Sequence, residues 1–440
     1  MDIVGIIEKK RDKKELTDEE IRFFIKSVCN GTAADYQISA LLMAIYLNKM
    51  TDRETAVLTD AMAHSGDIMD LSFAQGIKID KHSSGGVGDK TTLVVAPLVA
   101  ACGLKVAKMS GRGLGFSGGT IDKLESIRGF QTSLPEEKFR ELVNKNGLCV
   151  ISQTKDVATA DKKLYALRDV TGTVPDMSLI ASSIMSKKLA CNSDGIVLDV
   201  KVGSGAFVKT VEEAVELARK MVAIGTANGK KTVAAITDMD QPLGFAAGNA
   251  LEVEEAVKTL KGEGPEDFTE LCMIIAGFML VLGEKATDFA EARGLLADAI
   301  KSGRAFEKFV DFVRDQQGDV SVINNTELLP KAKLVESVKA QHDGFIGSIM
   351  TENIGRAAIV LGAGRLKKED SINFATGVVF RKKVGDSVKK DDVICEIHAD
   401  DEKSAQSAKE LILSSVSISK SAEKRKMLIA YVDKDGVHYE

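Results

Sequence analysis

Residues 78–93 read KIDKHSSGGVGDKTTL, and the α/β pattern of the chain begins at this stretch. The glycines, serines and threonines lead into TTLVVAPLVAAC, which we expect to start a helix. The first backbone N–H groups of a helix have no partner inside it, so a glycine loop at this position favours an anion. The stretch therefore predicts an anion-binding loop, and the question is which anion it holds.

An ATP-binding loop is the first alternative, because GVGDKTT resembles one. The P-loop pattern requires glycine directly before its lysine and again five positions earlier. Asp89 and Ser84 occupy those two positions relative to Lys90. A carboxylate next to the lysine would repel a triphosphate, so the sequence argues against an ATPase and favours a smaller anion.

A second loop of the same kind, KMSGRGLGFSGGTIDKLE, spans residues 108–125 and follows the short strand pattern LKVA. Loops at the ends of neighbouring strands of one sheet can converge on a single ligand. We therefore expect both loops to bind one inorganic phosphate or phosphoryl group. The predicted phosphate-binding residues are Lys81, Ser83, Thr92, Lys108, Ser110 and Thr120.

Composition excludes several classes of protein. The net charge is −5, tryptophan is absent and aromatic residues make up 5% of the chain, so we expect no nucleic-acid partner. No apolar run is long enough for a membrane span or a signal peptide, which predicts a cytoplasmic protein without a membrane partner. The six cysteines are scattered without a CxxC pair, which predicts buried, reduced thiols.

The pattern along the chain predicts an α/β fold with three parts. A small, discontinuous all-helical domain comprises residues 1–66 and 160–193. A large mixed α/β domain comprises residues 67–159 and 194–330 and binds phosphate. A C-terminal β-rich subdomain, residues 331–440, resembles a biotinyl/lipoyl-type barrel sandwich.

Local signals support this division. Thr17 with Glu20, and Thr51 with Glu54, form the S/T-x-x-E pattern that starts a helix. Residues 329–343 read as a linker, and a turn at residues 385–386 predicts β-hairpins.

Several long strings carry a resemblance to a known family. SGRGLGFSGGTIDKLE, residues 110–125, resembles the signature of the thymidine and pyrimidine-nucleoside phosphorylases, and KHSSGGVGDKTTL resembles their phosphate loop. The similarity continues through residues 165–190, 194–207 and 237–257, and it reaches LGAGR at residues 361–365. It therefore covers nearly the whole chain.

The resemblance implies a reaction and assigns residues to it. Inorganic phosphate and a pyrimidine nucleoside (uridine, thymidine or deoxyuridine) give the free base and (deoxy)ribose 1-phosphate, reversibly. Negative charge develops on the leaving pyrimidine, so the site needs cation or proton donors opposite the phosphate. The implied catalytic residues are His82, Arg168 and Lys187, and the implied base and sugar contacts are Arg168, Ser183, Lys187 and Lys108.

The sequence departs from the family pattern at two notable positions. Phe116 stands where the family has histidine, which puts any role of that histidine in doubt. Lys90 stands where some relatives have a threonine that helps to bind potassium. The other residues of that tentative potassium site are Gly88, Leu243, Ala246 and Glu255. We expect no cofactor in the chemistry, potassium at most as a structural ion, and hypothesise that the Lys90 ammonium replaces it.

Lys108 is typical of the broader pyrimidine-nucleoside group, whereas thymidine-selective members carry methionine there. A lysine could bond a ribose 2′-hydroxyl, so the broad enzyme is favoured and a thymidine-selective phosphorylase is the first alternative. A magnesium-dependent phosphoribosyltransferase of related fold, and a carrier or scaffold that uses the C-terminal barrel, are further alternatives. The resemblance also implies a homodimer.

Overall fold

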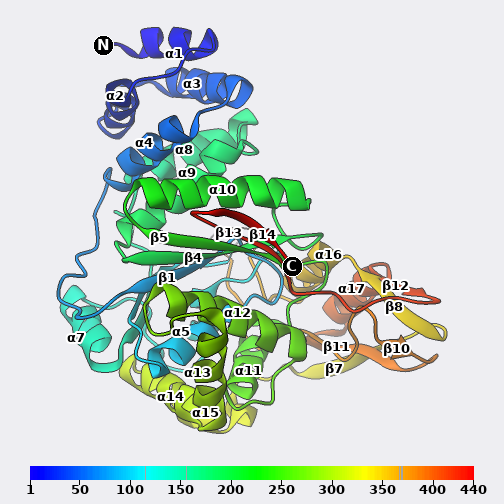
Figure 1. The fold of residues 1–440 in the computed structure, drawn as a ribbon. Helices are drawn as coiled ribbons and strands as arrows, with labels where there is room; N and C mark the ends of the chain where they lie inside the picture. The colour runs from blue at the N-terminus through cyan, green and yellow to red at the C-terminus, as the bar shows by residue number, and fades with distance from the viewer. Residues whose placement is uncertain (114, 155, 366, 368–369) are drawn as a thin grey trace.

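The computed structural model describes residues 1–113, 115–154, 156–365, 367 and 370–440. Leu114, part of the signature loop, lies outside the described residues. In Figure 1 the N-terminal helices (blue) are stacked at one end, a central sheet lies in the middle, and the strands of residues 334–419 project to one side. No described helix combines the length and apolar character needed to cross a membrane.

The N-terminal helices begin where the capping residues predict. They are α1 (Ile3–Arg11), α2 (Asp18–Cys29), α3 (Asp35–Asn48) and α4 (Asp52–Ala63). Thr17 and Thr51 each accept a hydrogen bond from the backbone of the glutamate three residues later, and both capping boxes are complete.

Helices α8 (Thr159–Thr171) and α9 (Met177–Ala190) return to this bundle from a distant part of the chain. Leu164 of α8 and Leu179 of α9 share one hydrophobic core with the first four helices. Ile180 and Met185 of α9 instead pack against the central sheet. Helix α9 therefore joins the bundle to the α/β part, which matters because it carries predicted site residues.

The central sheet has the order β1 (Ile79–Ser83), β4 (Gly195–Val202), β5 (Lys231–Asp238), β13 (Leu428–Asp433), β14 (Gly436–Tyr439). Strands β1, β4 and β5 are parallel, and β13 is antiparallel to β5. Alternate residues of β4 enter different cores because successive side chains of a strand point to opposite faces. Ile196 and Leu198 face α10 (Val211–Ala227), whereas Val197 belongs to the core that contains α5 (Thr91–Ala101) and α12 (Glu266–Leu282).

The second glycine loop follows a strand that belongs to a different sheet. Strand β2 (Val106–Ser110) pairs in parallel with β3 (Leu148–Ser152). Among the described residues, one bridge between Lys78 and Lys105, which directly precede β1 and β2, joins it to the central sheet. The prediction that both loops follow strands of the same sheet was therefore wrong, although β1 and β2 contact each other. The remaining helices of this part are α6 (Thr120–Glu125), α7 (Glu136–Asn146), α11 (Asn249–Leu260), α13 (Phe289–Lys301), α14 (Arg304–Asp315), α15 (Ser321–Asn324) and the 3-10 turn η1 (Thr326–Leu328).

The C-terminal part builds two small sheets around its own core. One has the order β6 (Ala246–Ala247), β9 (Gly377–Phe380), β11 (Val393–Ala399), β7 (Leu334–Lys339), and the other β10 (Ser387–Val388), β8 (Gly344–Ile349), β12 (Val416–Ser419). Helices α16 (Thr351–Val360) and α17 (Glu402–Leu413) pack against each other beside these sheets.

Three expectations for this part need correction. Residues 329–343 are not simply a linker, because β7 lies within them and pairs with β11. The turn at residues 385–386 does not close a hairpin, because β9 pairs with β11 while β10 pairs with β8. The predicted subdomain of residues 331–440 loses its final strands, because β13 and β14 extend the central sheet. These pairings depend on contacts distant in sequence, which a local pattern does not contain.

Candidate active site

A cavity of about 280 Å³ lies where the carboxyl ends of β1 and β2 face helix α9. Ligands of open α/β sheets bind at this edge, because the loops that follow the strands meet there. The structure brings eight of the predicted residues to the cavity wall: Lys81, His82, Ser83, Thr92, Lys108, Ser110, Thr120 and Lys187.

The first glycine loop supplies one wall of donors. The backbone N–H of Gly85 donates to the Ser83 hydroxyl oxygen at 3.2 Å, so the hydroxyl hydrogen of Ser83 can itself donate to an anion in the cavity. Gly85 adopts a φ of +92°, a left-handed conformation that favours glycine and turns the loop toward α5. Thr92 lies in the first turn of α5, where unpaired N–H groups attract an anion.

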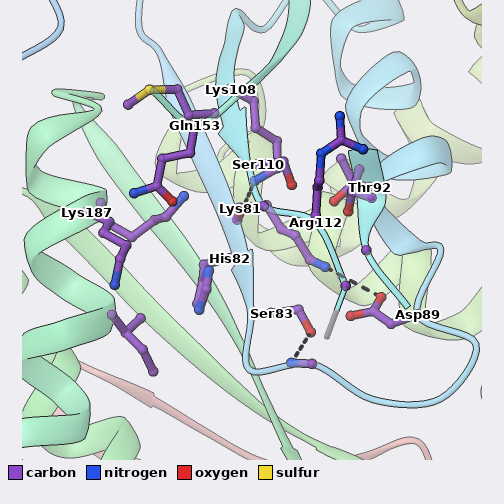
Figure 2. A pocket seen from close by; sticks show the side chains of 18 of the residues that line it. Lys81, His82, Ser83, Asp89, Thr92, Lys108, Ser110, Arg112, Gln153 and Lys187 are labelled. Carbon is purple, nitrogen blue, oxygen red and sulfur yellow. Dashed lines mark hydrogen bonds and ion pairs between the residues drawn. The ribbon is translucent and has the colours of Figure 1, made fainter. Parts of the chain in front are cut away.

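Lys81 supplies the central cation of this wall. Its Nζ lies 3.9 Å from Oδ1 of Asp89 and 3.7 Å from Oδ2 of Asp199, so both carboxylates are near but beyond hydrogen-bond distance. Figure 2 shows the Lys81 ammonium pointing toward Asp89, with a dashed line for this long ion pair. Among the described residues, none holds this ammonium by a hydrogen bond, and it is free to bind an anion.

Lys108 is anchored by a buried carboxylate beneath the cavity. Its Nζ donates to Oδ1 of Asp80 at 3.1 Å and to the carbonyl oxygen of Lys81, while Lys188 of α9 donates to Oδ2 of Asp80 at 2.7 Å. Burial, with the ammonium groups of Lys188 and Lys81 nearby, lowers the pKa of Lys108 to about 8 although Asp80 opposes the change. Lys108 is therefore a cation that loses its proton just above neutral pH.

His82 lies in Figure 2 between Lys187 on one side and Lys81 on the other. Burial and the positive charges of Lys188 and Lys108 lower the pKa of His82 well below its usual range. The imidazole is therefore neutral at pH 7 and carries one N–H donor and one acceptor nitrogen. No described residue forms a side-chain hydrogen bond with it, so both nitrogens are available to a ligand.

Helix α9 contributes the opposite wall. Lys187 Nζ contacts the Asp161 carboxylate and donates to the carbonyl oxygen of Ser183 at 3.0 Å and to its hydroxyl at 3.3 Å. Ser183 is buried and, among the described residues, is not part of the cavity wall. Lys187 is thus the side chain of this pair that reaches the cavity.

Arg168 is bound to backbone carbonyl groups of the segment that leads into and begins α9. Its guanidinium is buried and donates to the carbonyl oxygens of Thr173, Val174 and Leu179, which ties α8 to the start of α9. It is not among the described residues that line the cavity. A role of Arg168 in contacting the base therefore stays a prediction.

The cavity also contains residues that the sequence did not single out. Gln153 follows β3 and donates its backbone N–H to the carbonyl oxygen of Ser110 at 3.0 Å, while Arg112 pairs with Asp122 and Glu125. Lys188 stands beside Lys187 in the sequence, and that double lysine was the available signal. Gln153 belongs to no recognisable motif, because its place depends on the pairing of β3 with β2.

Lys90 occupies the middle of the tentative potassium site. Its Nζ donates to the carbonyl oxygens of Leu243 at 2.6 Å and Ala246 at 3.1 Å, and it lies 2.6 Å from Oε2 of Glu255. The ammonium is fully buried and takes up the oxygen atoms that would coordinate a cation. With Lys90 in this position the residues do not fit a potassium ion.

Phe116 lies against the C-terminal part of the chain. It packs on the hydrophobic core that contains Val87 and Ile354, and it is not among the described residues that line the active-site cavity. The position where the family has histidine is therefore used here for an apolar contact between domains.

Family models match three parts of the chain. Residues 4–66 match the model "Glycosyl transferase family, helical bundle domain", residues 75–306 match "Glycosyl transferase family, a/b domain", and residues 345–419 match "Pyrimidine nucleoside phosphorylase C-terminal domain". Anthranilate phosphoribosyltransferase from Thermus thermophilus shares the fold, with a TM-score of 0.59 and 18% identity over 71% of this chain and 99% of its own.

Whole-chain relatives are much more similar. The pyrimidine-nucleoside phosphorylase of Staphylococcus haemolyticus is 57% identical over 402 residues, which cover 91% of this chain and 93% of the relative. The pyrimidine-nucleoside phosphorylase of Geobacillus stearothermophilus is 55% identical with the same coverage. The chain therefore belongs to the pyrimidine-nucleoside phosphorylase family.

Proposed function

We propose that the protein catalyses the reversible phosphorolysis of uridine, thymidine and deoxyuridine. One observation carries the proposal: a single cavity has a cationic, hydroxyl-rich wall on β1 and β2 and faces Lys187 on α9, with His82 between them. This arrangement supports a reaction that binds phosphate on one side and a leaving base on the other. It also supports the predicted phosphate-binding roles of Lys81, Ser83 and Thr92.

The chemistry needs two kinds of stabilisation. A phosphate oxygen forms a bond to C1′ of the pentose while the bond from C1′ to the pyrimidine nitrogen breaks, and the electron pair leaves with the base. The base takes one proton from the site or from solvent. His82, which is neutral, donates its N–H to a pyrimidine carbonyl, and the Lys187 ammonium stabilises the developing negative charge.

Lys108 is the residue we propose for accepting ribonucleosides. Its ammonium has three N–H groups, and the described structure uses two of them on Asp80 and the Lys81 carbonyl. The third can bond the 2′-hydroxyl of uridine, which thymidine lacks. We expect Lys108→Met to reduce kcat/KM for uridine at least about tenfold more than for thymidine.

We propose that the reaction requires no bound metal cation. Lys90 supplies the positive charge that potassium would otherwise bring to Glu255, so we propose that neither potassium nor another cofactor takes part. The cytoplasmic location stays a prediction.

A homodimer is the proposed assembly. Tyr36, Met43 and Leu47 are exposed on α3 at spacings of seven and four residues, which places them on one face, and Val4 is exposed on the adjoining α1. Clustered exposed apolar side chains of this kind mark protein interfaces. We propose that a second copy of the chain covers this face.

The deciding experiment incubates the protein with uridine, with and without phosphate. We expect uracil and ribose 1-phosphate only when phosphate is present, as measured by chromatography and phosphorus NMR. Release of uracil without phosphate would indicate a hydrolase. Magnesium-dependent consumption of uracil with phosphoribosyl pyrophosphate would favour the phosphoribosyltransferase alternative, and a biotinyl or lipoyl mass on the chain would favour a carrier.

A further inference from the structure

The Lys81 ammonium has no hydrogen-bond partner among the described residues, although a carboxylate lies close to it. Lys81 is almost fully buried, and Oδ2 of Asp199 lies only 3.7 Å from its Nζ. A buried lysine beside a buried carboxylate normally closes into a direct ion pair, because the attraction between opposite charges strengthens in a poorly hydrated interior. A closed pair would turn the Lys81 ammonium away from any anion in the cavity.

Asp199 instead accepts one hydrogen bond and forms one ion pair with other groups, and in that ion pair neither Oδ2 of Asp199 nor Nζ of Lys201 has a hydrogen-bond partner among the described residues. Its Oδ1 accepts a hydrogen bond from the Thr237 hydroxyl at 2.6 Å, and the Nζ of Lys201 lies 2.9 Å from Oδ2. Asp199 and Lys201 point to the same face of β4 because they are two residues apart. Both side chains are fully buried, and Lys201 does not line the cavity.

The pair also lies directly beneath the glycine loop. The backbone N–H of Lys201 donates to the Ser84 hydroxyl at 2.9 Å, and the backbone N–H of Ser84 donates to the Asp199 carbonyl at 2.9 Å. A Cβ at Gly86 would lie 3.0 Å from Cδ of Lys201. Lys201 thus packs under Gly86 and does not line the cavity, so its ammonium is placed to act on Lys81 through Asp199 rather than to bind the anion itself.

We propose that Lys201 is a positioning residue for phosphate: by pairing with Asp199 it prevents that carboxylate from capturing Lys81. The difference between 2.9 Å and 3.7 Å from the same Oδ2 atom carries the inference. It rests on the proposed function, in which phosphate is the anion that Lys81 binds.

The test compares Lys201→Met with the double variant Asp199→Asn/Lys201→Met in the full chain. Methionine keeps the length of the buried side chain, and asparagine keeps the Thr237 contact but has no negative charge. In Lys201→Met we expect Asp199 to draw Lys81 away, which raises KM for phosphate at least about tenfold while KM for uridine changes less than about twofold. The double variant should return KM for phosphate to within about threefold of the unchanged protein.

Calorimetric titration with inorganic phosphate alone provides a readout that does not need turnover. We expect the Kd for phosphate to rise in Lys201→Met and to recover in the double variant. Equal increases in KM for phosphate and uridine, or no recovery in the double variant, would overturn the proposal. If Lys201→Met does not fold, a double variant that binds phosphate normally supports the proposal and one that binds it weakly overturns it.

The two proposals can fail separately. A protein that binds phosphate but releases no uracil contradicts the phosphorolysis, while the titrations still decide the role of Lys201.

Discussion

Lys108 links the charge of the cavity to pH. Its pKa of about 8 means that the ammonium needed to bind phosphate or the sugar is lost as the pH rises through that value. We expect kcat/KM for uridine to fall above about pH 8 with the loss of one proton. Because the pKa of His82 lies well below its usual range, no step near pH 6.5 is expected from that residue.

The measurement is a pH profile of kcat/KM at fixed ionic strength, with Lys108→Met as the matched control. The variant should be less active throughout and should lack the decline near pH 8. The same decline in the variant would assign the proton to another group.

Lys90 gives a second prediction for a single residue. Lys90→Ala leaves the Glu255 carboxylate buried without its cation, which we expect to lower the free energy of unfolding by about 3 kcal/mol and to reduce activity. Rates of uracil release in potassium, sodium and choline chloride should be equal for the unchanged protein.

Lys90→Thr is the informative control for this prediction. It introduces the residue that some relatives carry, so its activity and stability should depend on potassium. A strict potassium requirement of the unchanged protein would contradict the replacement of the ion by Lys90.

The convergence of the two glycine loops could be predicted, because each loop is a continuous motif in the sequence. Both glycine loops contain hydroxyl groups that can donate hydrogen bonds to phosphate. The structure places Ser83, Thr92, Ser110 and Thr120 around one cavity. Asp80 could not be predicted, because a buried carboxylate shared by two lysines from distant segments leaves no local pattern. For Lys188 the signal was its place beside Lys187.

At the scale of elements, α9 carries the lysines of one cavity wall, and Asp176 caps it. The carboxylate accepts the Leu179 backbone N–H at 3.0 Å and also receives Lys49 Nζ at 3.1 Å. We expect Asp176→Ala to lower the free energy of unfolding by about 1 kcal/mol in urea denaturation, because an N-terminal N–H loses its partner.

The variant Asp176→Asn distinguishes the effect of the N-cap hydrogen bond from the effect of the ion pair with Lys49. Asparagine is an equally good cap, and an ion pair with the exposed Lys49 contributes little. A loss in Asp176→Asn as large as that in Asp176→Ala would show that the ion pair matters more than the cap.

Helix starts could be predicted from the sequence, whereas strand partners could not. Thr17 and Thr51 predict where α2 and α4 begin, because a capping box is contained within four residues. The partners of β9, β10 and β13 lie in segments that are from just over ten to nearly 190 residues away in the sequence. Arg168 shows the same limit, since only the packing of α8 on α9 reveals that its guanidinium binds backbone carbonyls.

For the whole molecule, the exposed face of α1 and α3 predicts the assembly. We expect a dimer by light scattering, and we expect Tyr36→Glu/Leu47→Glu to shift it to a monomer because two charges would be buried in the interface. Phe207→Glu, at an exposed apolar residue of the α/β part, is the matched control and should remain dimeric. A monomeric unchanged protein would contradict the proposed homodimer.

The pairing of β13 with β5 has a consequence for biosynthesis. Strand β5 ends at Asp238, but its partner begins at Leu428, so nearly 190 residues must be translated between them. During that interval β5 presents an unpaired edge made of buried, β-branched and small residues, the kind of edge that pairs with other chains. In a ribosome-bound nascent chain this edge can therefore pair with another chain until β13 is synthesised and covers it.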